Sequence, residues 1–87
     1  MSGKAAQLRV RRIEPGKAAI TFEPSGTIKL NGQHLDCAWR LQPPSDRSSN
    51  GTTLLTKNSD LFVATINFCQ RGTLTVHCQD SEQQVEI

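Results

Sequence analysis

Between Leu35 and Leu41, every second residue is Leu, Cys or Trp, and the residues between them are Asp36, Ala38 and Arg40. Because successive side chains of a β-strand point to opposite faces, this period of two predicts a strand with one buried and one solvent-facing side. The same alternation recurs in shorter segments, including 18–23, 61–68 and 83–87. Turn-forming residues such as Pro-Gly and Asn-Gly separate these segments, and no stretch of three helical turns carries an apolar stripe. The pattern therefore predicts an all-β protein.

The chain of 87 residues is long enough for one small domain and too short for a cofactor domain joined to a substrate domain. We predict a flexible N-terminus over 1–6 and a single domain over 7–87. Short strands at this spacing are typical of a small antiparallel β-sandwich with immunoglobulin-like architecture, or a small barrel, of roughly seven to eight strands. Cys37 and Trp39 lie only two positions apart and tyrosine is absent, so the likeness to immunoglobulins extends to architecture alone.

Two turn signals predict which strands are neighbours. Asn31-Gly32 favours positive φ at both centres of a two-residue hairpin, so we expect 27–30 to pair with the strand that follows. A three-residue loop over 70–72, with a glycine at its last position, is expected to pair 61–68 with the next strand. Both registers place apolar residues opposite each other, which favours the two hairpins.

Two polar segments complete the prediction. The stretch 42–52 contains two prolines and a glycine and no apolar side chain outside those prolines, so we expect a mobile polar loop there. A short strand over 53–56 follows it. Near the C-terminus we expect a turn around 79–82 that brings Cys78 opposite Val85 on the buried side.

The three cysteines are Cys37, Cys69 and Cys78, and an odd number leaves at least one thiol without an intramolecular partner. Cys37 and Cys78 fall on apolar phases, so we expect small buried side chains there. A disulfide between them is the alternative, and it would require an oxidising compartment. His77 and Cys78 are adjacent and would point to opposite faces, so we predict no metal site.

Charge is distributed unevenly along the chain. Residues 1–12 carry four basic and no acidic side chains, whereas 80–87 carry three acidic and no basic ones. Strands of opposite charge favour pairing within one chain or between subunits. The basic segment, together with the 42–52 loop, predicts a partner-binding surface. Its candidate residues are Arg9, Arg11, Arg12, Lys29, Arg40 and Arg47.

The sequence contains none of the motifs that indicate catalysis. It lacks a Gly-x-Ser-x-Gly elbow and a phosphate-binding glycine pattern, and no spacing brings two carboxylates together. We therefore expect no enzymatic activity, no catalytic residue and no cofactor. All the aromatic residues fall on buried phases, so stacking on single-stranded nucleic acid is not expected.

These observations predict a non-enzymatic protein-interaction module. It would be a self-associating structural subunit, or a small inhibitor or adaptor, that docks through edge strands and the basic N-terminal strand. The alternative is a small nucleic-acid-binding β-barrel whose basic arm contacts phosphates. No apolar run is long enough to span a membrane and no apolar leader is evident, so we expect a cytoplasmic or nucleoplasmic protein.

Overall fold

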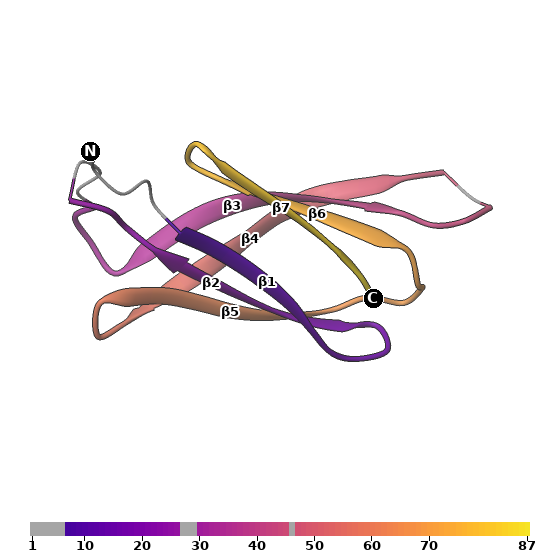
Figure 1. Ribbon diagram of the computed structural model, residues 1–87, viewed down its shortest axis with the longest axis horizontal. Helices are drawn as coiled ribbons and strands as arrows, with labels where there is room; N and C mark the ends of the chain where they lie inside the picture. Colours follow the sequence, from indigo (N-terminus) through magenta and orange to yellow (C-terminus); the bar gives the residue numbers. More distant parts are fainter. Residues whose placement is uncertain (1–6, 27–29, 46) are drawn as a thin grey trace.

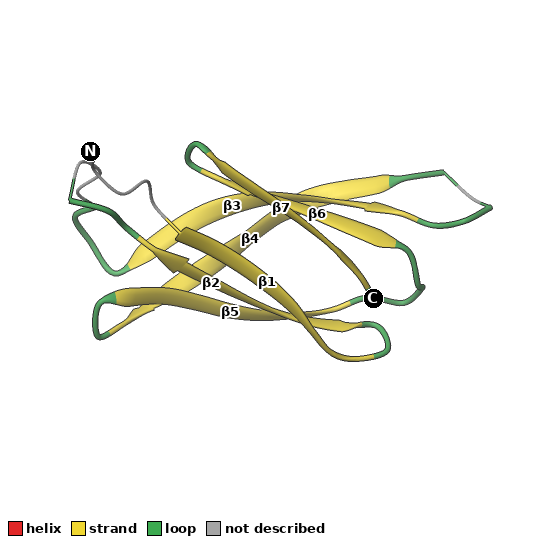
Figure 2. Cartoon of the chain, in the orientation of Figure 1, coloured by secondary structure: helices red, strands yellow, loops and turns green. Residues whose placement is uncertain are grey.

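The computed structural model describes residues 7–26, 30–45 and 47–87. These residues form an all-β structure without a helix (Figure 2). No described helix is long and apolar enough to cross a membrane. The strands of this region are β1 (Gln7–Glu14), β2 (Lys17–Glu23), β3 (His34–Gln42), β4 (Ser49–Asn58), β5 (Leu61–Asn67), β6 (Thr73–Cys78) and β7 (Ser81–Glu86).

The seven strands of the described region form one antiparallel sheet in the order β1-β2-β5-β4-β3-β6-β7. The sheet curls until its two end strands, β1 and β7, lie side by side, which gives a nearly closed barrel (Figure 1). The order β1-β2-β5-β4 followed by β3-β6-β7 is that of the two sheets of a seven-stranded immunoglobulin-type sandwich, but here β3 and β4 pair along eight residues, so the two groups are halves of one continuous sheet. The prediction of a small all-β sandwich or barrel is confirmed.

The core lies where the alternating residues of facing strands meet. Ile20 and Phe22 of β2 and Val76 of β6 are fully buried. Leu41 of β3 leaves only 2% of its surface exposed. Trp39 is only half-buried, although its phase predicts a core position. Its ring packs edge-on against Phe68, with the ring centroids 5.1 Å apart.

The two buried cysteines are joined by a disulfide, so the expectation of free thiols is wrong and the alternative holds. Ala38 of β3 pairs with His77 of β6, so Cys37 and Cys78 are the next positions along the same two strands. Their Cα atoms are 4.6 Å apart, the separation found at non-hydrogen-bonded positions of an antiparallel pair. The register of β3 with β6 therefore brings the two sulfur atoms together.

The second predicted hairpin does not form. β5 pairs with β2 and β4, so the segment after it crosses to the β6 position instead of turning back. The first predicted hairpin would pair 27–30 with the start of β3, and 27–29 lie outside the described residues. Leu30 lies outside the strands, and the described partners of β3 are β4 and β6.

Two further boundaries differ from the prediction. Ser81 is paired with Cys78, so the last hairpin has a two-residue turn whose first residue, Gln79, has φ 55°, and His77 faces Glu82. The expected loop 42–52 shrinks to 43–48, because β4 begins at Ser49 and pairs with β3. Polar residues join this strand because its outward face is exposed to water.

We expect the disulfide to stabilise the fold by restricting the unfolded chain, since it links residues 41 positions apart. Replacing both cysteines (Cys37→Ala with Cys78→Ala) should lower the free energy of unfolding in urea by about 2–4 kcal/mol. The control is Cys69→Ser, because Cys69 is exposed and free. Equal unfolding midpoints for the double variant and the parent would contradict the prediction.

Gly72 should be intolerant of any side chain. A Cβ atom at this position would lie 2.5 Å from the carbonyl oxygen of Gln42, and its φ is 156°. Gly72→Ala should therefore cost about 1–3 kcal/mol in urea unfolding. Gly26→Ala is the matched control, because no atom lies within 4 Å of the corresponding Cβ and stability should hardly change. A similar loss in both variants would show that close packing at Gly72 is not the cause.

Candidate interaction surface

Arg9 and Arg11 project from the outer face of β1, because they alternate with Leu8 and Val10, which pack into the core. The ladder with β2 places Arg9 opposite Thr21 and Arg11 opposite Ala19. These short β2 side chains leave a hollow of about 260 Å³ that both arginines line. Long cationic side chains thus flank a floor of small residues.

A second hollow adjoins the first one across β2. It has a volume of about 290 Å³ and is lined by Arg9, Thr21 and Leu61, with Gln7 and Glu23 at its sides. Leu61 comes from the start of β5 and is half-buried. We refer to Arg9, Arg11, Ala19, Thr21 and Leu61 together as the Arg9–Arg11 surface.

A third hollow follows the seam between the two end strands of the sheet. Its lining comes from the start of β1 (Gln7, Leu8 and Arg9) and the start of β7 (81–83), and its volume is about 400 Å³. The two strands run in the same direction (Figure 1), and no ladder joins them in the described part of the chain. The basic and acidic ends of the chain are therefore neighbours within one molecule, separated by a polar seam.

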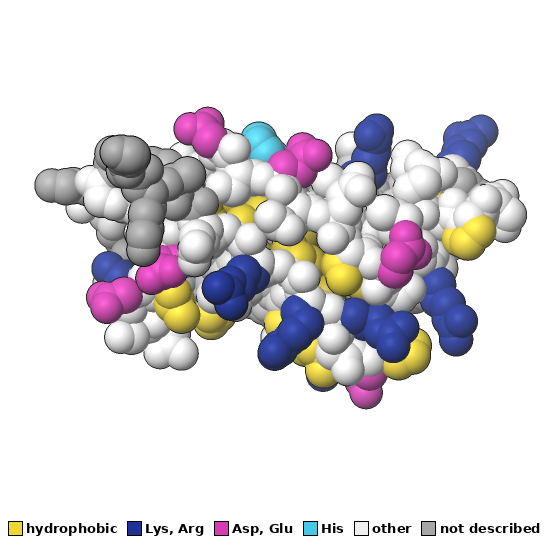
Figure 3. All heavy atoms as spheres, in the orientation of Figure 1, with side chains coloured by type: hydrophobic (Ala, Val, Ile, Leu, Met, Phe, Trp, Pro, Cys, Tyr) yellow, Lys and Arg dark blue, Asp and Glu magenta, His cyan; other side chains and the backbone are white. Residues whose placement is uncertain are grey.

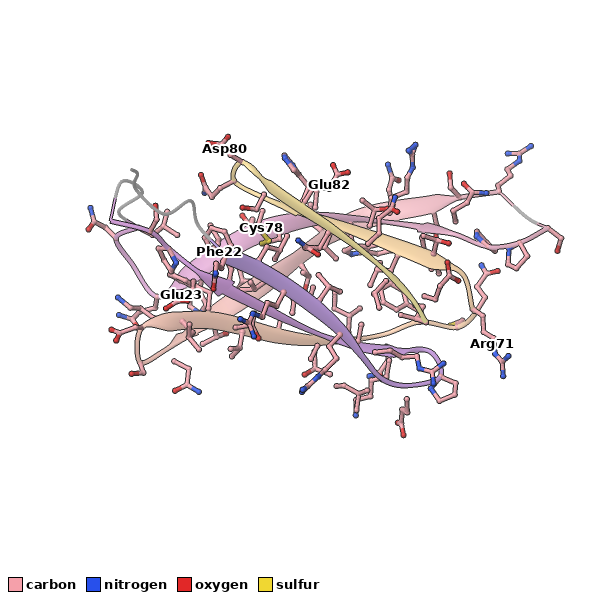
Figure 4. The ribbon with its side chains drawn as sticks, viewed as in Figure 1. Phe22, Glu23, Arg71, Cys78, Asp80 and Glu82 are labelled. Carbon is pink, nitrogen blue, oxygen red and sulfur yellow. A yellow bond between two sulfur atoms is a disulfide. The ribbon has the colours of Figure 1, made fainter. Side chains whose placement is uncertain are left out.

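Basic and acidic side chains both lie on this face. Figure 3 shows Lys and Arg side chains gathered along the strip where β1 lies. Asp80 and Glu82 stand at the border formed by the β6–β7 turn (Figure 4), and Glu23 and Glu82 each line a hollow that Arg9 also lines. No ion pair joins Arg9 or Arg11 to a carboxylate among the residues that the structure describes. Both arginines are exposed.

The six candidate residues do not share one surface. Arg12 is opposite the buried Ala18, so it shares the inward phase of Leu8 and Val10. Its own side chain is exposed, and it lies next to a shift in register. Arg40 projects from the outer face of β3, opposite Thr75 of β6. Both strands lie in the half of the sheet that does not contain β1. Arg47 is exposed in the β3–β4 connection. Lys29 lies outside the described residues.

Sequence reasoning missed Leu61 and the β7 residues of the seam. Alternation along β2 predicts that Thr21 faces outward. The pairing of β1 with β2 is then enough to place Thr21 beside Arg9. Leu61 reaches the same surface because β5 pairs with β2. Along the chain, Leu61 is at least 38 residues from every residue of β2. No local signal encodes that neighbour.

The site consists of exposed strand side chains above a shallow floor. Among the described residues, no group of three or more His, Cys, Asp and Glu side chains is placed to hold a metal ion. Comparison of the chain with protein-family models, curated proteins and solved structures finds no match. Interpretation of the surface therefore depends on its own geometry and charge.

Proposed function

We propose that the protein is a non-enzymatic interaction module that docks an acidic, extended segment of a partner protein on the Arg9–Arg11 surface. The observation that supports this proposal most is the position of Arg9, which lines all three hollows described above. A ligand bound in any of them lies beside Arg9. Arginine binds carboxylates through two parallel hydrogen bonds, which suits it to recognition of acidic side chains.

The spacing of the arginines favours an extended partner. Arg9 and Arg11 are two residues apart on a strand, so their Cα atoms are about 7 Å apart. Every second side chain of an extended peptide has the same spacing and points to the same side. Carboxylates at alternate positions of such a segment would meet both arginines, while its backbone lies over Ala19 and Thr21. The small floor residues leave room for this backbone.

Binding to a peptide of alternating Glu and Thr provides the test. Arg9→Ala with Arg11→Ala should raise its Kd about tenfold in fluorescence anisotropy, since each exposed ion pair contributes up to about 1 kcal/mol. Arg71→Ala removes one exposed charge between β5 and β6, where it lines none of the three hollows, and should leave the Kd unchanged. Arg40→Ala should also have no effect, because Arg40 lies on the other half of the sandwich.

Two ligand controls separate the proposal from its alternative. A peptide with Gln in place of Glu should not bind, and a DNA duplex of similar length should bind more weakly than the acidic peptide. Stronger DNA binding that falls steeply with salt and is lost in the double arginine variant would favour the nucleic-acid-binding barrel. Peptide binding that is insensitive to both arginines would overturn the proposal.

The compartment is a separate part of the proposal. The cytoplasmic or nucleoplasmic location stays a prediction, and the buried Cys37–Cys78 bond weighs against it, because such bonds persist mainly in oxidising compartments. We propose that the chain acts in an oxidising environment. Thiol labelling of protein taken from its native source should then modify Cys69 alone, whereas labelling of all three cysteines would support the reducing compartments.

A further inference from the structure

The first half of β4 has a free edge. β4 pairs with β3 from Ser49 to Thr56, but its ladder with β5 covers only Thr56–Asn58 within the described residues. Figure 1 shows the two strands meeting at one end of the molecule and diverging toward the other, where the β3–β4 hairpin projects. We call residues 49–55 the β4 edge.

The direction of the backbone groups along this edge follows from its ladders. Successive residues of a strand direct their N–H and C=O groups to opposite sides. Lys57 donates its N–H to the Gln33 carbonyl on the β3 side, at 2.7 Å, so Thr56 faces β5. By the same alternation Asn50, Thr52 and Leu54 direct their N–H and C=O groups away from β3. These residues form no backbone ladder on that side in the part of the chain that the structure describes.

The two end strands of the sheet carry features that discourage sheet-to-sheet pairing, whereas the β4 edge does not. β1 presents arginines and a shift in register, and β7 presents Glu82 and Glu86. The β4 edge is Ser-Asn-Gly-Thr-Thr-Leu-Leu, with neither a charge nor a proline, and its register with β3 is regular. Leu54 leaves 53% of its surface exposed there. A neutral, regular edge of this kind is a pairing surface.

The middle of the β4 edge is in contact with an aromatic pair. The Trp39 ring lies against the backbone of Gly51, where a Cβ atom would come within 2.8 Å of it. The same ring packs against Phe68, which follows β5. No described strand pairs with 49–55 on the side away from β3, so we consider a strand from outside the molecule as the partner of this edge.

We propose that the β4 edges of two copies of this chain pair antiparallel about Thr52 and join their sheets into a dimer. In this register Thr52 faces the partner's Thr52, and Asn50 faces the partner's Leu54. Every N–H and C=O group that these residues direct outward then finds a complement across the two-fold axis. The interface is isologous, so association closes at two copies. No like charges meet along the β4 edges.

The test uses charge at the centre of the proposed register. Thr52→Lys places two lysines opposite each other, and Thr52→Glu does the same with two carboxylates, so each variant alone should sediment as a monomer. An equimolar mixture of the two variants should recover the dimer, because lysine then faces glutamate. The parent should be a dimer at the upper end of a concentration series in sedimentation velocity. Thr52 is exposed, so these changes should not disturb the fold.

Matched variants separate the edge from nonspecific effects of charge. Thr56→Lys introduces the same change on the same strand, at an exposed position that is paired on both sides, and should remain dimeric. Thr52→Pro removes only an N–H that faces away from β3 and should give a monomer, whereas Thr52→Val keeps the N–H and the dimer. Circular dichroism establishes that each variant is folded.

The inference is overturned by a parent that stays monomeric throughout the series, by dimeric Thr52→Lys, or by a Lys–Glu mixture that stays monomeric. The proposal does not depend on the Arg9–Arg11 surface. The Arg9→Ala with Arg11→Ala variant should dimerise as the parent does, so failure of peptide binding and failure of dimerisation are distinguishable.

Discussion

The pairing of β3 with two strands at once is the interaction on which the rest of the structure depends. Its first half pairs with β4 and its second half pairs with both β4 and β6, so β3 joins the two halves of the sandwich. Side chains from both halves of β3, such as Leu35 and Leu41, belong to the core. The Cys37–Cys78 bond links β3 to β6 at the next position of the same register, which adds a covalent constraint where the backbone already pairs.

The two end strands of the sheet and the β4 edge differ in how they meet the solvent. β1 and β7 lie next to each other across a polar seam, where Arg9 and Glu82 line the same hollow. β4 is the middle strand of the sheet order, and its edge is neutral. We therefore propose a division of roles, in which the charged edge region recognises an acidic partner and the neutral edge associates with a second copy. This division follows from edge chemistry, because charge deters indiscriminate strand pairing.

Local turn chemistry predicted where strands end better than it predicted which strands pair. Asn31-Gly32 and Gly72 both mark real chain reversals or crossings, and Gly72 is required by its approach to Gln42. The hairpin inferred from Gly72 does not form, because the segment around it crosses from β5 to β6, which are not neighbours in the sheet. Apolar residues faced each other in the wrong registers as well as in the right ones. Apolar matching cannot therefore select a partner when every strand has an apolar face.

For the candidate site, the sequence predicted the outward direction of Arg9 and Arg11 from alternation with Leu8 and Val10. It grouped Arg12 and Arg40 with them as candidates. By the same alternation Arg12 shares the inward phase of Leu8 and Val10, and the structure places it opposite the buried Ala18. Arg40 belongs to a strand in the other half of the sandwich, and only the order of strands reveals that separation.

The sequence by itself determined the all-β class, the buried face of most strands and the uneven charge of the two ends, since these depend on residues close together in the chain. The tertiary structure alone decided the strand order, the disulfide, the hollows around Arg9 and the free edge of β4. Each of these joins residues distant in sequence, and the free energy that selects them comes from packing the whole sandwich. The contact of Trp39 with Phe68 is one such contribution, and no local pattern encodes it.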